Sequence, residues 1–100
     1  MRYILQVDFP FSGPWGEEMA LAMQELAQSI NHETGMVWKI WTENPEENRA
    51  GGIYLFETEQ TAKDYLSMHC LRLKSFGIED IEAKIFIANQ ALSKLNHGPL

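Results

Sequence analysis

One of the three histidines, His69, lies where a side chain could do acid–base chemistry. It follows Ala62 by seven residues and precedes Phe76 by seven. A helix through this segment would therefore carry all three on its apolar side and point the imidazole at the sheet below. Such a histidine can act as a general base near neutral pH or donate a hydrogen bond to an oxygenated substrate. The alternative is a core histidine bonded to a backbone carbonyl, and the spacing leaves both open.

Aromatic side chains that could surround a flat apolar ligand lie on the neighbouring segments. Trp38 and Trp41 are three residues apart on one expected strand, so they should face opposite sides of the sheet. We expect Trp38 to line a pocket under the helices together with Phe9 and Tyr65, which leaves Trp41 for the other face. The alternative is that each tryptophan is simply a large core residue.

Arg72 follows His69 by about one helical turn. Its guanidinium could hold an anionic oxygen of a substrate at the mouth of the pocket. The alternative is a surface residue that suits the C-terminal end of the helix. The only cysteine, Cys70, would be turned about 100° away from His69 on a helix, so we expect no Cys–His nucleophile pair.

The sequence carries no metal or cofactor motif. The histidines at 32, 69 and 97 and the lone cysteine lack any HxH, HxxE or CxxC spacing, which metal sites favour. No glycine-rich turn joins a strand to a helix in the flavin or nicotinamide pattern. We therefore expect no metal and no bound cofactor. An oxidation here would need a substrate that supplies its own electrons, as a deprotonated phenol or hydroquinone does.

Composition and charge exclude several partners. Eight basic residues stand against fourteen acidic ones, for a net charge of −6, so no basic face for nucleic acid is expected. No run of about 20 apolar residues is present to span a membrane. The N-terminal segment alternates apolar and polar residues and reads as a strand rather than a signal peptide. We expect one cytoplasmic domain over residues 1–100.

The periodicity predicts an α+β fold with a β-α-β-β-α-β order, the ferredoxin-like arrangement with a four-stranded antiparallel sheet. Pro14 suits the first position of the first helix, Thr58 suits the N-cap of the second, and Gly77 suits its C-terminal end. A short helix is possible in the tail after residue 88. The expected strands span residues 3–11, 36–43, 50–57 and 78–88, and the expected helices span residues 12–31 and 58–76.

The face of the sheet away from the helices should be an interface. Without a bulge, Leu5, Val7, Trp38, Ile40, Ile53 and Leu55 would point at the helices. The other face would then carry Gln6, Asp8, Lys39, Trp41, Tyr54, Phe56, Lys84 and Phe86. Monomers rarely expose such an apolar patch, so we infer a homodimer through the face with Trp41, Tyr54 and Phe56. A bulge, for which Gly51-Gly52 is a suitable place, would change this assignment.

The segments "FSGPWGEEM", "SINHETGMVWKIWTE", "AGGIYLF" and "YLSMHCLRLKSFG", in this order and spacing, closely resemble the YdhR monooxygenase family. The resemblance covers nearly the whole chain. It implies a dimeric α+β barrel, in which two ferredoxin-like protomers face their sheets together. It also implies kinship with cofactor-independent monooxygenases that oxidise aromatic polyketides to quinones.

Three functions follow from these observations. The first is a cofactor-independent monooxygenase that oxidises a small phenol- or hydroquinone-like aromatic compound, with His69 as the base. The second is a non-catalytic module that binds a hydrophobic small molecule, for example in a stress response. The third is haem binding or degradation, which other members of this superfamily perform. For that function Gln6 and Asp8 stand where an asparagine is expected.

Overall fold

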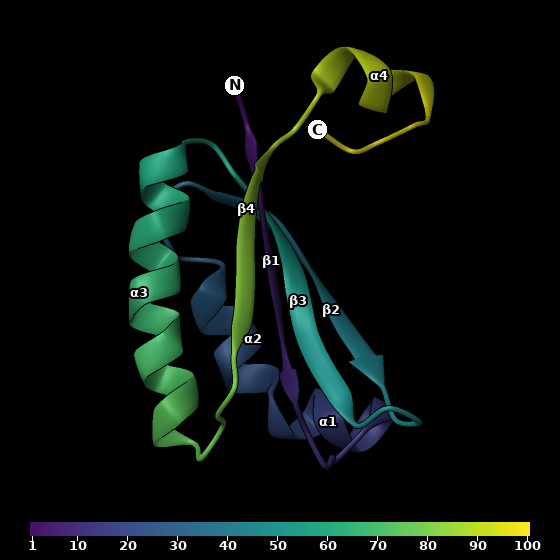
Figure 1. Cartoon of the computed structure of the whole chain (residues 1–100), viewed down its shortest axis with the longest axis vertical. Coiled ribbons are helices and arrows are strands. Elements are labelled where there is room, and N and C mark those ends of the chain that lie inside the picture. The colour runs from purple at the N-terminus through teal and green to yellow at the C-terminus, as the bar shows by residue number, and fades with distance from the viewer.

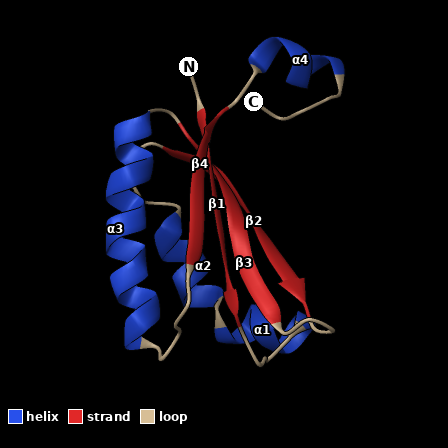
Figure 2. Ribbon diagram, in the orientation of Figure 1, coloured by secondary structure: helices blue, strands red, loops and turns tan.

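The alternating segments of the sequence form one antiparallel sheet of four strands, with the spatial order β2-β3-β1-β4. The computed structural model describes residues 1–100. Its strands are β1 (Tyr3–Pro10), β2 (Met36–Asn44), β3 (Arg49–Phe56) and β4 (Glu82–Ile87). Its helices are α1 (Gly16–Ala22), α2 (Gln24–Ile30), α3 (Glu59–Ser75) and α4 (Gln90–Leu95). The predicted ferredoxin-like order is therefore confirmed (Figures 1 and 2).

One face of the sheet, which we call the covered face, lies under α1, α2 and α3. The other, which we call the open face, has no helix packed along its strands (Figure 1). The core fills the space between the covered face and the helices. Its buried apolar residues are Leu5, Val7, Phe9, Met19, Ile30, Ala50, Tyr54, Phe56, Ala62, Tyr65 and Leu73.

The two ends of α3 form as the sequence indicates. The Thr58 hydroxyl accepts a hydrogen bond from the Thr61 amide at 3.0 Å, which satisfies a free N–H of the first turn. Gly77 follows the helix with a φ of +85°, a conformation that glycine adopts without steric cost. Phe76 departs in part from the prediction, because it is 58% exposed although it also contributes to the inner cavity lining.

The first helical segment begins later than predicted and is divided. Pro14 precedes the helix, which starts at Gly16, and Met23 separates α1 from α2 with φ −102° and ψ 7°. Trp15 occupies the N-cap and offers no side-chain oxygen. The Gly16 amide instead donates to the carboxylate of Glu43 on β2, at 3.0 Å, because an anion is stabilised at a helix N-terminus.

A bulge in β2 decides which side chains face the helices. Met36 pairs with Phe56, but Trp38 pairs with Leu55, so the strand gains one residue between them. The extra residue turns Trp38 to the open face and places Lys39 and Trp41 on the covered face. The bulge lies at Met36–Trp38 and not at the predicted Gly51-Gly52.

The predicted assignment of Trp41, Tyr54 and Phe56 to the face away from the helices is wrong. Tyr54 pairs with Leu5 and Phe56 pairs with Tyr3, and paired residues share a face. Tyr54 and Phe56 are 1% and 0% exposed. The sequence did not reveal this, because the odd-numbered and the even-numbered residues from Ile53 to Phe56 are all apolar, so alternation does not indicate which side is buried.

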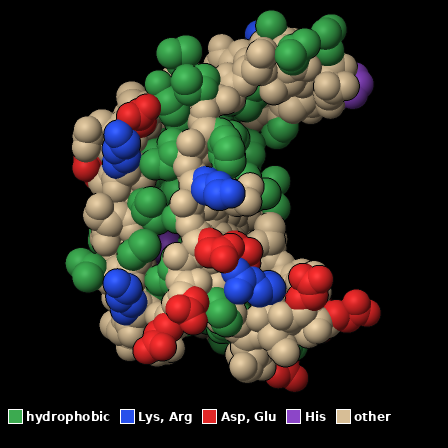
Figure 3. Space-filling view, viewed as in Figure 1, with side chains coloured by type: hydrophobic (Ala, Val, Ile, Leu, Met, Phe, Trp, Pro, Cys, Tyr) green, Lys and Arg blue, Asp and Glu red, His purple; other side chains and the backbone are tan.

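The open face carries two kinds of surface. One row across the strands holds Trp38, Leu55, Ile4 and Phe86, and the next holds Ile40, Ile53, Gln6 and Lys84. Leu55 is itself fully buried, so the exposed part of the first row comes from its neighbours. Figure 3 shows hydrophobic side chains over the upper part of the molecule and acidic and basic ones together lower down. No helix in the structure has the length and apolar character needed to cross a lipid bilayer.

Candidate active site

A small cavity lies between the covered face and the three helices. Its volume is about 30 Å³, which is room for one or two waters. Three side chains bring polar atoms to it: Lys39 from β2, Tyr54 from β3 and His69 from α3. The rest of the lining is apolar apart from two glycines, and it comprises Val7, Phe9, Phe11, Met19, Met23, Leu26, Trp41, Leu73, Phe76 and Ile78.

A hydrogen-bonded network connects the cavity to α3. The His69 Nε2 lies 3.3 Å from the Tyr54 hydroxyl. The Tyr65 hydroxyl donates to the Tyr54 hydroxyl at 3.2 Å. Arg72 then contacts the Nδ1 of His69 through its Nη2 at 2.9 Å, and the same Nη2 donates to the Tyr65 hydroxyl at 3.4 Å. Four polar side chains are thus held together under the helix.

Arginine fixes the tautomer of His69. A guanidinium has only N–H donors, so the Nδ1 of His69 must accept from Arg72 and the Nε2 must carry the hydrogen. That Nε2–H then donates to the Tyr54 oxygen, which also accepts from Tyr65. Because Tyr54 accepts twice inside the network, its own hydroxyl hydrogen is free to donate to a molecule in the cavity.

The environment of His69 does not favour the predicted role of general base. Burial, followed by the charges of Lys39 and Arg72, lowers the pKa of His69 from 6.5 to about 3. The imidazole is therefore neutral at pH 7. Its one lone pair points at a cation, and its other nitrogen is a donor. The geometry favours His69 as a hydrogen-bond donor that positions Tyr54.

Lys39 lies inside the site without a carboxylate partner. Its Nζ is 3.4 Å from the centre of the Trp41 ring and 4.6 Å from that of Tyr54, and it belongs to none of the ion pairs of the chain. Burial, followed by the charge of Arg72, lowers the pKa of Lys39 from 10.5 to about 7. The two aromatic faces attract the ammonium form and oppose part of this shift.

Gly52 makes the room that Lys39 occupies. It lies opposite Trp41 on the covered face, and a Cβ there would come within 2.7 Å of the Cε of Lys39. Gly51 has a different reason to be glycine, because a Cβ there would overlap the backbone carbonyl of Val7 on β1. Gly52 thus leaves space for the Lys39 side chain, and Gly51 allows the close contact between β3 and β1.

The structure distributes the predicted site residues over three places. Phe9 and His69 line the cavity. Tyr65 and Arg72 lie behind it and reach it through hydrogen bonds. Trp38 does not face the cavity, so its predicted placement is wrong, and its indole N–H donates to the Pro99 carbonyl at 2.6 Å.

Sequence reasoning missed three members of the site: Lys39, Trp41 and Tyr54. Trp41 takes the place predicted for Trp38, because the bulge shifts the register of β2. A lysine between apolar residues on a central stretch of strand was an available signal. Lys39 and Trp41 are two positions apart on the strand, so they lie on the same face, but the sequence does not reveal which face that is.

A second space lies directly outside the cavity. This outer groove, between α1, α2 and β2, has a volume of about 270 Å³. Met19, Met23 and Trp41 line both the cavity and the groove. They form the wall between the two, and methionine side chains adapt their shape easily. A shift of this wall would join the spaces.

Comparison with known proteins places the chain in a family and a fold. Residues 4–99 match the family described as "Putative mono-oxygenase ydhR". The structure resembles a mutant of SnoaB, a cofactor-independent oxygenase from Streptomyces nogalater, with a TM-score of 0.62 and 15% identity, over 88% of this chain and 93% of that one.

Two further solved structures share the fold. A structural-genomics protein named YJCS gives a TM-score of 0.62 and 18% identity, over 88% of this chain and 98% of that one. An antibiotic biosynthesis monooxygenase, described as putative, from Deinococcus radiodurans gives a TM-score of 0.57 and 13% identity, over 89% of this chain and 93% of that one. No curated protein sequence matches the chain.

Proposed function

Because this chain belongs to the ydhR mono-oxygenase family, we propose that it oxidises a small phenol- or hydroquinone-like compound with O₂ and without a bound cofactor. Family membership supports a monooxygenase activity in general. The substrate class rests on one observation: the apolar cavity is walled by aromatic rings and holds Lys39, His69 and Arg72 beside it with no carboxylate. Such a site favours a flat ligand that carries negative charge on oxygen.

The proposed reaction balances without a cofactor. A phenol first loses its hydroxyl proton, and the electron-rich phenolate then reduces O₂. In a substrate whose para carbon is unsubstituted, the ring C–H para to the hydroxyl becomes a carbonyl, which takes one oxygen atom. The second oxygen atom leaves as water with the ring hydrogen and the phenol hydrogen. The product is a quinone, and one O₂ is consumed for each substrate.

The network under α3 would hold the phenolate oxygen. Tyr54 donates its free hydroxyl hydrogen to this oxygen, and His69 and Tyr65 keep the Tyr54 oxygen in place. Arg72 holds His69 and adds positive charge. We therefore propose Tyr54 as the residue that contacts substrate. His69, Tyr65 and Arg72 act through it.

A substrate must enlarge the cavity to enter. At about 30 Å³ the cavity is too small for an aromatic ring, since pockets for small molecules usually measure about 300–1,000 Å³. The outer groove offers the missing space behind Met19, Met23 and Trp41. We propose that this wall moves aside to admit the ring from the groove.

Oxygen uptake tests the proposal directly. Metal-free protein is mixed with a panel of dihydroxy-aromatic compounds and anthrone-like phenols in an oxygen electrode, with His69→Ala and Tyr54→Phe alongside. The exposed His32 gives a matched control, His32→Ala. We expect uptake that both site variants reduce and the control keeps. Uptake that is equal in all four proteins would remove this network from the reaction.

A non-catalytic binding module is the second candidate, because the cavity is closed and apolar. It predicts tight binding of the same compounds without oxygen consumption, which calorimetry beside the oxygen electrode would reveal. Haem binding gains no support from the geometry. The Nδ1 of His69 accepts from Arg72 and the Nε2 faces Tyr54, so neither nitrogen is free for iron.

We also propose a homodimer, now through the open face. Ile40 and Phe86 on this face are 52% and 47% exposed, and a second copy would cover them. Size-exclusion chromatography with light scattering tests this. Ile40→Glu is expected to give a monomer, while the exposed helix variant Leu71→Glu keeps the dimer.

A further inference from the structure

Lys39 differs from the other four lysines of the chain. Lys63, Lys74, Lys84 and Lys94 are exposed, whereas Lys39 is half-buried and reaches into the cavity. It has no carboxylate within ion-pair distance. A lysine that is partly withdrawn from water and unpaired costs stability. Such a side chain in a cavity is a candidate for function rather than for structure.

No other polar group of the site can accept a proton at neutral pH. The lone pair of His69 is taken by Arg72. Arg72 itself stays protonated. Burial raises the pKa of Tyr54 and of Tyr65, so both hydroxyls stay neutral. Lys39 alone combines a nitrogen lone pair, which its neutral form offers, with a position on the cavity wall.

We propose that Lys39 is the proton acceptor for the bound substrate, an inference that rests on the proposed function. The neutral amine takes the hydrogen from the phenol O–H. The O–H bond breaks, an N–H bond forms, and the product is an ammonium beside a phenolate. No oxidant takes part in this step. The electron transfer to O₂ follows it.

The surroundings of Lys39 stabilise the product of this transfer. The new ammonium lies over the rings of Trp41 and Tyr54, which attract a cation. The phenolate lies near the ammonium and receives the free hydrogen of Tyr54. The step therefore turns an unpaired lysine into half of an ion pair, and Gly52 leaves the space for it.

Ligand ionisation gives a test that does not depend on turnover. Protein is titrated under nitrogen with 3-nitrophenol, at a pH above the pKa of Lys39 and below that of the free phenol, and the yellow phenolate band is followed by absorbance. The wild type is compared with Lys39→Met, which keeps most of the side-chain volume, and with the exposed control Lys63→Met. Gly52→Ala, which displaces the Cε of Lys39, is a second variant should Lys39→Met fold poorly.

We expect the phenolate band in the wild type and in Lys63→Met. Lys39→Met and Gly52→Ala should bind 3-nitrophenol without this band. In the oxygen assay, Lys39→Met should lower kcat/KM by about 10²–10⁴-fold, the usual contribution of a general base. The loss should fall mainly on kcat.

The outcomes separate the two proposals. No phenolate band in the wild type, or an equal band in Lys39→Met, overturns the role of Lys39, whatever the oxygen electrode records. A band that depends on Lys39, together with no oxygen uptake on any phenol, supports the proton transfer and overturns the oxygenase. Uptake that survives in Lys39→Met also overturns the role of Lys39 but keeps the oxygenase.

Discussion

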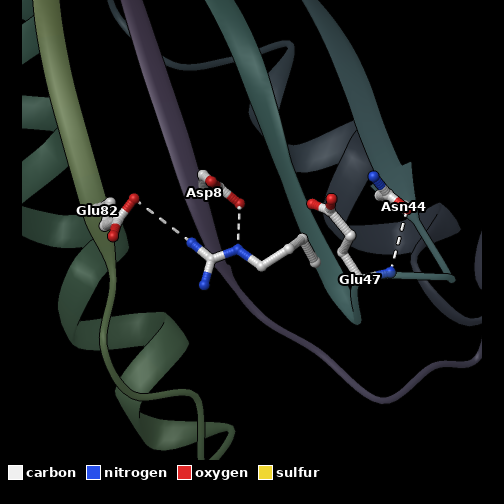
Figure 4. A network of polar contacts seen from close by, with 5 residues as sticks. Asp8, Asn44, Glu47 and Glu82 are labelled. Carbon is white, nitrogen blue, oxygen red and sulfur yellow. Dashed lines mark hydrogen bonds and ion pairs between the residues drawn. The ribbon is translucent and has the colours of Figure 1, made fainter.

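Arg49 on the open face lies between two carboxylates, whereas Lys39 on the covered face and Arg72 on α3 form no ion pair with any carboxylate. Arg49 donates to Asp8 at 3.0 Å and lies 3.5 Å from Glu82 (Figure 4). These contacts, the hydrogen bond to Asp8 first, raise the pKa of Arg49. On the covered face, burial and Arg72 lower the pKa of Lys39 instead.

The two faces of the sheet therefore treat charged side chains differently, with paired charges on the open face and unpaired charges at the site. Charges on an open, wet surface are matched at little energetic cost or gain. Charges kept unmatched under a helix are costly, and they remain strong because little water screens them. We infer that the unpaired cations beside the covered face serve to bind a ligand. The paired charges on the open face serve solubility and contact with another copy of the chain.

The largest expected effect is on the pH dependence of catalysis. Lys39 must be neutral to accept a proton, so kcat/KM should fall about tenfold per pH unit as the pH drops below about 7. The groups that face Lys39 are Tyr54 from β3 and His69 and Arg72 from α3, whereas β1, α1 and α2 present only apolar side chains. A profile that stays flat between pH 5 and 8 would contradict the assignment.

The adjacent glycines give the next largest effect. Gly51→Ala would drive a Cβ into the Val7 carbonyl, and we expect it to destabilise the fold by about 3 kcal/mol or more. Gly52→Ala meets the flexible end of Lys39, so its cost should lie at the low end of the range for overpacking, about 1 kcal/mol, while catalysis falls. Urea denaturation of both variants measures the contrast. Equal losses of stability would mean that Gly52 is structural too.

Removing the unpaired lysine should stabilise the protein. The pKa of Lys39 is about 7 in the fold, against 10.5 for a free lysine, so between these values the unfolded chain holds a proton that the native chain lacks. Folding stability from this group therefore rises with pH over that window, and the penalty is complete below it. Lys39→Met should gain about 1–3 kcal/mol at pH 6 and little at pH 11. A loss of stability would identify a structural lysine.

The smallest effect is expected on the open face. Arg49→Met removes contacts that water already screens, so the melting temperature should move less than in any variant above, and less still in high salt. Lys63→Met, which breaks the exposed pair with Glu59 at 2.7 Å, is the matched control. A larger shift for Arg49→Met would indicate that its network supports an interface.

Sequence patterns predicted much of the fold and part of the site. Thr58 and Gly77 marked the ends of α3, because capping depends on local backbone geometry. Spacing alone placed His69 on the inward side of that helix, where it is 3% exposed. The role predicted for His69 did not follow, since spacing does not reveal that Arg72 occupies its lone pair.

The sequence by itself determined the order of elements, the two ends of α3 and most of the inward stripe of α3, because each depends on residues a few positions apart. Only the tertiary structure decided which face of the sheet each central aromatic occupies. Because of one extra residue at Met36–Trp38, Trp41 instead of Trp38 lies on the covered face. The same shift places Lys39 in the cavity. A one-residue shift reverses every later side chain of a strand, and it depends on pairing between strands that no local pattern records.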